Sequence, residues 1–143
     1  MEHEKDSILI SACLVGERCR YDGNHNKIDC LDQLSKKYRL VSACPEQLGG
    51  LDTPRDPAEK LGNRVITTSG LDVTKAFFNG AKETLKRYHA NHCKFAVLKE
   101  RSPSCGCGKI YDGSFQKNLI DGNGMTAQLF LDNGIVIFGE SDM

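Results

Sequence analysis

The stretch SILISAC, Ser7 to Cys13, is a short apolar run that begins at a polar residue and is followed closely by Gly16. Isoleucine-rich runs of this length are typical of strands that are buried on both faces of a sheet. The stretch YRLVSAC, Tyr38 to Cys44, has the same character and also ends in cysteine. We therefore expect two buried strands, each with a cysteine at its carboxyl end.

Further strand candidates alternate with helix candidates along the chain. The strand candidates are RVITT (64–68), KFAVLKE (94–100) and GIVIFGE (134–140). The helix candidates are CLDQLSKKY (30–38), a segment that follows LDVT (71–74), and GMTAQLFLDNG (124–134). This alternation, with strands that are continuously apolar, predicts an α/β three-layer domain of Rossmann-like type, in which a mostly parallel central sheet carries helices on both faces.

The helix after LDVT has the clearest pattern. Its apolar and aromatic residues recur at helical spacing: Phe77, Ala81, Leu85, Tyr88 and His92. This spacing predicts a helix that has Asp72 or Thr74 as its N-cap and ends near Ala90. The last helix candidate ends in Asn133 and Gly134, a pair that predicts a helix ending with a residue in the left-handed conformation.

Length and charge limit the classes of protein to consider. A chain of 143 residues has the usual size of one domain, so we expect a single domain over 1–143 with its core at about 7–139. Nineteen basic and nineteen acidic side chains cancel, which argues against DNA or an anionic membrane as a partner.

The apolar stretch ILISACLV is too short to span a bilayer, and MEHEKDS before it is polar, so we expect a cytoplasmic protein.

The number of cysteines is high and odd. Seven cysteines in a chain without a recognisable secretion signal indicate reduced thiols rather than a disulfide framework. Cys30 and Cys93 stand in helix-like surroundings, and we expect them to be small buried apolar residues.

The remaining cysteines mostly follow predicted strands. Cys13 ends the first strand, Cys44 ends the second, and Cys105 and Cys107 lie in the loop that follows the strand at 94–100. Ligands of open α/β sheets bind beyond the carboxyl ends of the strands. We therefore expect these thiols to share one site.

Two kinds of metal centre are compatible with such a site. Structural zinc takes four ligands, often in paired C-x-x-C knuckles; the chain has no such pair, although Cys19, Cys105 or Cys107 could each supply a fourth thiol. An iron–sulfur cluster accepts cysteines that are scattered through a fold. Three cysteines on a four-iron cluster would leave one iron open, as a catalytic site requires.

Four blocks of the sequence resemble successive motifs of the thiouracil desulfidase (TudS) family. They are SACLVGERCRYDG (11–23), CPEQLGGLDTPRDPAE (44–59), DVTKAFFNGAKETL (72–85) and LKERSPSCGCGKIYDGSF (98–115). The resemblance runs in family order from about Ile8 to about Ile137. It implies an oxygen-sensitive [4Fe-4S] cluster that is held by three cysteines and whose fourth iron takes the sulfur of a thiolated pyrimidine.

The resemblance assigns the three metal ligands, position by position, to Cys13, Cys44 and Cys105. Cys107 is not in that set, and we expect it to be a neighbour of the cluster rather than a ligand. The implied enzyme is a non-redox desulfidase that replaces C=S by C=O and releases sulfide. Its substrate is a thiopyrimidine, namely 2- or 4-thiouracil or thiouridine monophosphate, and the balanced charge argues against thiolated tRNA.

Glu46 and two serines are the candidates for proton transfer. Glu46 follows Cys44 closely, where a carboxylate could activate water or could simply stand at a helix N-terminus; we favour the catalytic role, which matches an acidic position of the family. Ser102 resembles the family's functional serine and would assist proton transfer. Ser104 is expected to hydrogen-bond the loop or a cluster sulfide beside the substrate.

The motif RYDG supplies candidates for the substrate rim. Arg20, Tyr21 and Asp22 form either an ordinary turn or part of the substrate-binding surface, and both interpretations stay open. Lys109 and Arg55 are further candidates for contact with the phosphate of a nucleotide.

Two other classes of function also stay open. The first is a metal-binding module without turnover. The second is a sulfur carrier in which one loop cysteine holds a persulfide. A carrier needs one activated thiol and no metal, whereas the desulfidase needs all three strand-end thiols.

Overall fold

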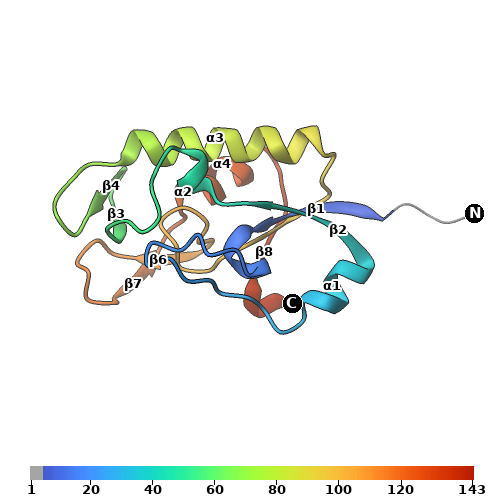
Figure 1. The fold of residues 1–143 in the computed structure, drawn as a ribbon. Helices are drawn as coiled ribbons and strands as arrows, with labels where there is room; N and C mark the ends of the chain where they lie inside the picture. The colour runs from blue at the N-terminus through green and yellow to red at the C-terminus, as the bar shows by residue number, and fades with distance from the viewer. Residues whose placement is uncertain (1–4) are drawn as a thin grey trace, which may run out of the picture.

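The computed structural model describes residues 5–143, so the first four residues of MEHEKDS lie outside the described part of the chain. A four-stranded parallel sheet with the order β2-β1-β5-β8 forms the centre (Figure 1). Its strands are β1 (Asp6–Ser11), β2 (Tyr38–Ala43), β5 (Ala96–Leu98) and β8 (Ile137–Gly139). The predicted α/β fold with a parallel central sheet is confirmed.

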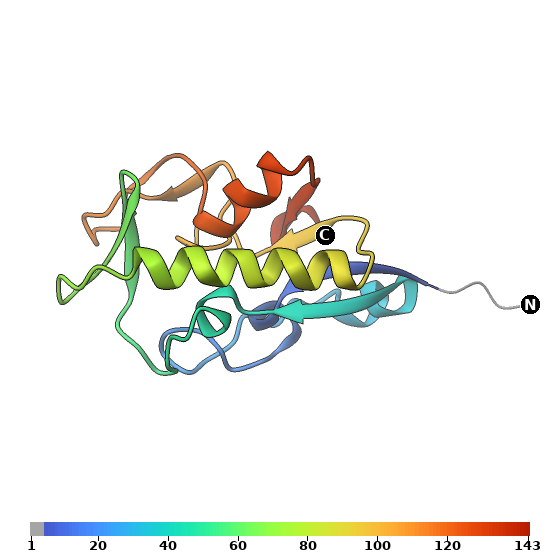
Figure 2. The same cartoon turned by 90° about the horizontal axis from the view of Figure 1, so that it is seen from above.

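Helices cover both faces of the sheet (Figure 1), and the view from above shows the long helix that lies across one of them (Figure 2). The helices and 3-10 turns are η1 (Ala12–Val15), α1 (Leu31–Lys37), α2 (Pro45–Leu48), α3 (Thr74–Ala90), α4 (Met125–Asp132) and η2 (Glu140–Asp142). Successive residues of β1 face opposite cores: Leu9 belongs to the core that includes Phe130 of α4, while Ile8 belongs to the core that includes Leu34 of α1. This is why the whole strand is apolar rather than alternating.

The ends of the long helices lie next to the predicted signals, although the N-cap of α3 is Val73 and not Asp72 or Thr74. The Oδ1 atom of Asp72 accepts a hydrogen bond of 2.9 Å from the backbone N–H of Thr74 at the start of α3, and the helix ends at Ala90. After α4, Gly134 has a φ of 73°, and the N–H of Ile135 bonds back to the carbonyl of Phe130. This is a Schellman ending. No helix within residues 5–143 is long and apolar enough to cross a membrane.

Two antiparallel hairpins extend beyond the carboxyl ends of the parallel strands (Figure 1). They are β3 (Ala58–Leu61) with β4 (Arg64–Thr67), and β6 (Lys109–Tyr111) with β7 (Leu119–Asp121). The RVITT strand was expected among the parallel strands, but it forms β4 and pairs with β3 in the first hairpin. The sequence did not reveal this partner because β3, the charged segment AEKL, has no apolar pattern typical of a strand. The second hairpin was not predicted.

Helix α2 rests on α3 with almost no space between their backbones. A Cβ atom on Gly80 of α3 would lie 1.8 Å from the carbonyl oxygen of Pro45, and one on Gly49 would lie 2.0 Å from the carbonyl oxygen of Ala76. Any side chain at either glycine therefore forces the two helices apart. Because α2 follows Cys44 directly, this contact fixes the place of that cysteine.

The variant Gly80→Ala tests the contact between the two helices. Helix propensity alone predicts that alanine stabilises α3 by about 1 kcal/mol. We expect the opposite sign, a loss of about 1–3 kcal/mol in the free energy of unfolding, because the new methyl group overlaps the backbone of α2. Urea unfolding followed by circular dichroism measures the change. A variant more stable than the parent would contradict the close packing.

Candidate active site

A cavity of about 460 Å³ opens where β1, β2 and β5 end. This is the position at which open α/β sheets bind ligands. Four thiols line it: those of Cys13, Cys19, Cys44 and Cys105. The structure therefore brings together the three cysteines singled out as metal ligands and adds a fourth.

Each of the three expected ligands comes from the segment just after a strand. Cys13 lies in η1 directly after β1, Cys44 is the N-cap of α2 directly after β2, and Cys105 lies in the loop after β5. The β1 strand ends two residues earlier than expected, so Cys13 lies in the next turn, which begins at Ala12, instead of closing the strand. Parallel pairing of the strands brings these segments to one edge of the sheet.

The fourth thiol, Cys19, is buried next to Cys13 and Cys44, and the Sγ atom of Cys44 donates to the carbonyl oxygen of Cys19 at 3.8 Å. The proximity of the Cys19 thiol is the main reason why the pKa of the Cys13 and Cys44 thiols is lowered, that of Cys44 to about 7. The same proximity raises the pKa of Cys19 itself. The site thus favours thiolate at two of its cysteines.

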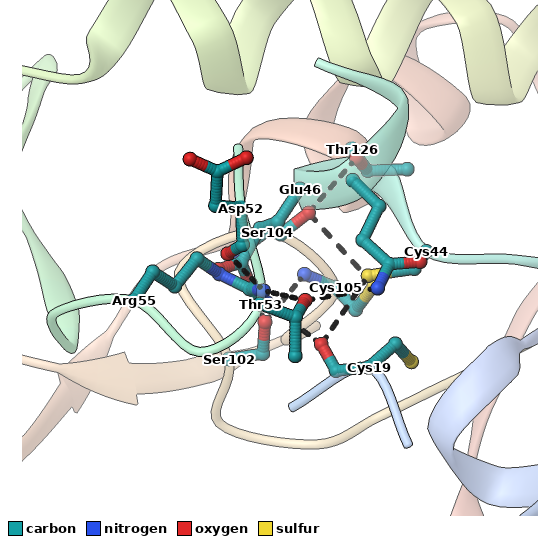
Figure 3. A network of polar contacts seen from close by, with 11 residues as sticks. Cys19, Cys44, Glu46, Asp52, Thr53, Arg55, Ser102, Ser104, Cys105 and Thr126 are labelled. Atoms are coloured by element: carbon teal, nitrogen blue, oxygen red, sulfur yellow. Dashed lines mark hydrogen bonds and ion pairs between the residues drawn. The ribbon is translucent and has the colours of Figure 1, made fainter. Parts of the chain in front are cut away.

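Cys105 has a different environment. Its thiol is 5% exposed, and burial raises its pKa to about 12. It lies 3.9 Å from the hydroxyl of Ser104, which in turn lies 3.2 Å from the hydroxyl of Thr126 (Figure 3). Ser104 is fully buried and does not line the cavity, so its place is behind the cysteine.

The thiols do not converge on one point. Within residues 5–143, no three His, Cys, Asp or Glu side chains are close enough together to hold a single metal ion. A tetrahedral zinc site requires such convergence. A four-iron cluster does not, because each thiolate binds a different iron atom. The donor set therefore fits a cluster better than zinc.

Glu46 faces the same cavity from the first turn of α2. Its Oε1 atom accepts a hydrogen bond of 3.0 Å from Nε of Arg55 (Figure 3), and both side chains are at least four-fifths buried. Burial raises the pKa of Glu46, and the neighbouring guanidinium opposes that rise. A carboxyl group with a raised pKa is a better base near neutral pH than a solvated one.

Arg55 was expected as a phosphate contact, but its guanidinium is engaged within the protein. Besides Glu46 it donates to the carbonyl oxygens of Asp52 and Cys19 and to the hydroxyl of Thr53, at 2.8–3.1 Å (Figure 3). The network joins α2 to the loop that carries Cys19. Arg55 thus lines the cavity but uses four of its five N–H donors within the protein, which leaves at most one for a substrate phosphate.

The variant Arg55→Met tests the importance of this network. It leaves a buried carboxylate without its cation and two carbonyl groups without a donor. We expect the free energy of unfolding to fall by about 2–4 kcal/mol. The matched control is Arg64→Met, whose ion pair with Asp72 is exposed, and it should behave like the parent. Equal urea midpoints for both variants would show that the network contributes little to stability.

Ser102 shapes the loop that carries Cys105. Its Oγ atom accepts hydrogen bonds of 3.0 Å from the backbone N–H groups of Ser104 and Cys105. It also lines the cavity. Since the oxygen accepts from the loop, the hydroxyl proton can point towards a bound molecule.

The remaining predicted rim residues divide into two groups. Arg20 and Tyr21 line the cavity. Asp22 does not; its carboxylate pairs with Arg20 at 2.9 Å. Lys109 also lies outside the lining and pairs with Asp121 on the exposed surface of the second hairpin. The structure therefore does not bring Asp22 and Lys109 to the site.

Sequence reasoning missed several residues that line the cavity. They are Glu59, Lys99, Glu100, Arg101, Tyr111, Phe115 and Lys117. Three of them, residues 99–101, directly follow β5, so the strand-end rule could have found them. The others come from the two hairpins, whose strands are too short and polar to be recognised from the sequence.

The other cysteines lie away from the cavity. Cys107 is exposed, and partial burial raises its pKa, the opposite of the direction expected for a reactive thiolate. Cys93 is buried in the core, as predicted. Cys30 is only half-buried and borders a second, apolar hollow of about 560 Å³ that also includes Phe95 and Phe138. Among residues 5–143, those that line this hollow include no carboxylate side chain and no second thiol.

Three comparisons relate this chain to known proteins. The sequence profile of the 2-thiouracil desulfurase family matches residues 8–142. The uncharacterized protein YbbK of Bacillus subtilis (strain 168) is 40% identical over 146 residues, which cover 95% of this chain and 97% of that protein. A solved structure, that of the [4Fe-4S]-dependent thiouracil desulfidase TudS, matches with a TM-score of 0.92 and 46% identity, over 97% of this chain and 93% of that chain.

Proposed function

This chain belongs to the 2-thiouracil desulfurase family, and from that premise we propose that it is an iron–sulfur-dependent thiouracil desulfidase, which replaces the thiocarbonyl sulfur of a thiolated pyrimidine with oxygen. The observation that carries the proposal is the placement of three strand-end thiols, a buried carboxylate and a serine hydroxyl around one cavity. The reaction adds water at the ring carbon and expels the sulfur as sulfide. No electrons are exchanged overall.

The residues proposed to hold the [4Fe-4S] cluster are Cys13, Cys44 and Cys105. Their support is that all three line the cavity, are free of disulfides and do not converge on a single-ion position. When bound, a cluster with one open iron position supplies a Lewis acid for the departing soft sulfur. All seven cysteines are free thiols, which supports a reducing compartment, the cytoplasm, as the place of action.

Glu46 is proposed as the general base. Its carboxylate takes a proton from the attacking water while Arg55 fixes its orientation through the bond to Nε. Ser102 is proposed to donate its hydroxyl proton to the pyrimidine as water adds and to take that proton back as the sulfur leaves, so that both protons of the water depart with the sulfide. Its oxygen is held by two backbone N–H groups, so the direction of the hydroxyl is restricted.

The proposed substrate is a free thiopyrimidine base or its nucleotide. A cavity of about 460 Å³ lies within the usual range for small-molecule sites. Arg20, Arg101 and Lys117 on the lining provide positive charge for a phosphate group. With no net charge on the chain, neither DNA nor tRNA is proposed as a substrate.

Sulfide release is the experiment that tests the function. The protein is reconstituted anaerobically with iron and sulfide and then given 2-thiouracil, 4-thiouracil, 4-thiouridine monophosphate and thiolated tRNA side by side. We expect visible absorption from the cluster and rapid sulfide release from a small thiopyrimidine. A colourless protein with full activity would favour a persulfide carrier, a brown protein without turnover would favour a metal-binding module, and tRNA as best substrate would overturn the proposed substrate class.

A further inference from the structure

The turn that joins β6 to β7 places two residues with strained backbone conformations on the cavity wall. Phe115 has a φ of 59° and Lys117 a φ of 61°, and both line the cavity. Residues other than glycine seldom adopt this left-handed region, because Cβ approaches the following carbonyl group. Such conformations persist only where the surrounding structure holds them.

A carboxylate from the other hairpin holds this turn. The Oε1 atom of Glu59 on β3 accepts hydrogen bonds from the backbone N–H groups of Gly113, at 3.0 Å, and Phe115, at 3.1 Å. A Cβ atom on Gly113 would lie 3.0 Å from the side chain of Leu61, so the two hairpins are in close contact there. Glu59 is thus the polar tie between β3 and the strained turn.

We propose that Glu59 is a positioning residue that holds Phe115 on the cavity wall and so determines how tightly a thiopyrimidine binds. The inference rests on the proposed function. The aromatic ring offers a flat apolar surface for a planar pyrimidine, and its place depends on the backbone of Phe115. Since the carboxylate fixes that backbone through its N–H, Glu59 acts through Phe115 and not by contact with the reacting atoms.

The first test is hydrogen exchange, which requires no turnover. In Glu59→Ala, the amides of Gly113 and Phe115 should exchange at least about tenfold faster, because both lose their acceptor. In Glu59→Gln, where an acceptor oxygen remains at the same position, they should stay protected. The amide of Thr126, which bonds to the carbonyl of Ser104, is the internal control. Unchanged exchange at Gly113 and Phe115 in the alanine variant would overturn the proposal.

The second test is a double-mutant cycle on the reconstituted enzyme. Glu59→Ala should raise KM for the best thiopyrimidine about five- to tenfold, with kcat within about twofold and unchanged cluster absorption. Phe115→Ala should raise KM by a similar factor, and the double variant should be no worse than the worse single variant. Glu83→Ala, which removes an exposed carboxylate from α3, is the control for charge.

The outcomes separate this inference from the proposed function. If the two substitutions multiply their effects on KM, Glu59 contacts the substrate by itself, and the proposal is wrong. If Glu59→Gln raises KM as much as Glu59→Ala, the negative charge matters rather than the acceptor, and the proposal is also wrong. If the parent protein turns over no thiopyrimidine, the proposed function fails, while the exchange experiment still reports on the tie between the hairpins.

Discussion

Replacing any one of Cys13, Cys44 or Cys105 with serine should abolish the visible absorption of the reconstituted protein and reduce sulfide release to the background rate. Each of these thiols comes from a different segment around the cavity, so the three substitutions test three separate points at which the cluster would be attached. Serine is a poor ligand for iron in a thiolate-held cluster. Iron and sulfide analysis, together with the absorption spectrum, measures the loss.

Cys107→Ser is the matched control for these three variants. Cys107 lies two residues after Cys105 but is exposed and does not line the cavity. We expect this variant to keep both the cluster and the activity. Loss of the cluster in Cys107→Ser, or its retention in Cys105→Ser, would show that the ligands have been assigned to the wrong member of the pair.

Glu46→Gln should slow turnover by about 10²–10⁴-fold, the usual cost of removing a general base. The absorption of the cluster should stay unchanged, because the side chain is not among the thiol ligands. Glutamine has the same shape and can still accept the hydrogen bond from Arg55, so the loss would report on basicity rather than on packing. Single-turnover sulfide release from the best substrate is the measurement.

A second variant, Glu46→Asp, tests whether the position of the carboxylate matters as well as its basicity. It keeps the carboxylate but withdraws it by one methylene group, and we expect an intermediate rate because displacement of a catalytic group by about 1 Å is costly. A near-parental rate in Glu46→Gln, with the cluster intact, would instead assign Glu46 to the support of Arg55. The unfolding midpoint of each variant distinguishes a chemical effect from a structural one.

The sequence was sufficient for those parts of the molecule that follow strong local rules. Continuous apolar runs identified β1, β2 and β5, and the ending of parallel strands at one edge placed Cys13, Cys44 and Cys105 around one cavity. Helix α3 was found because its apolar face repeats at helical spacing over many turns. These features depend on burial, which leaves a clear pattern in the sequence.

The parts that were missed depend on contacts between distant and polar segments. Glu59 and Phe115 are 56 residues apart, and nothing near either one indicates that they meet. Arg55 was interpreted as a phosphate contact because a cation in a loop has the same sequence signature whether it faces solvent or a buried carboxylate. Lys109 lies outside the cavity, where it pairs with Asp121 on β7, a strand that was not predicted.

Because the thiols follow three separate strands, the chain must fold before the cofactor can be inserted. The sheet that brings them together requires pairing of β1 with β5, where the N–H of Lys99 bonds to the hydroxyl of Ser11 across 88 residues. Pairings of such long range form late in folding, so the site does not exist on a nascent or unfolded chain. Insertion of the cofactor must therefore follow folding. Because the assembled site belongs to the native state, a bound cluster stabilises that state. The fraction of chains that is unfolded and open to proteases should therefore fall when the cluster is loaded.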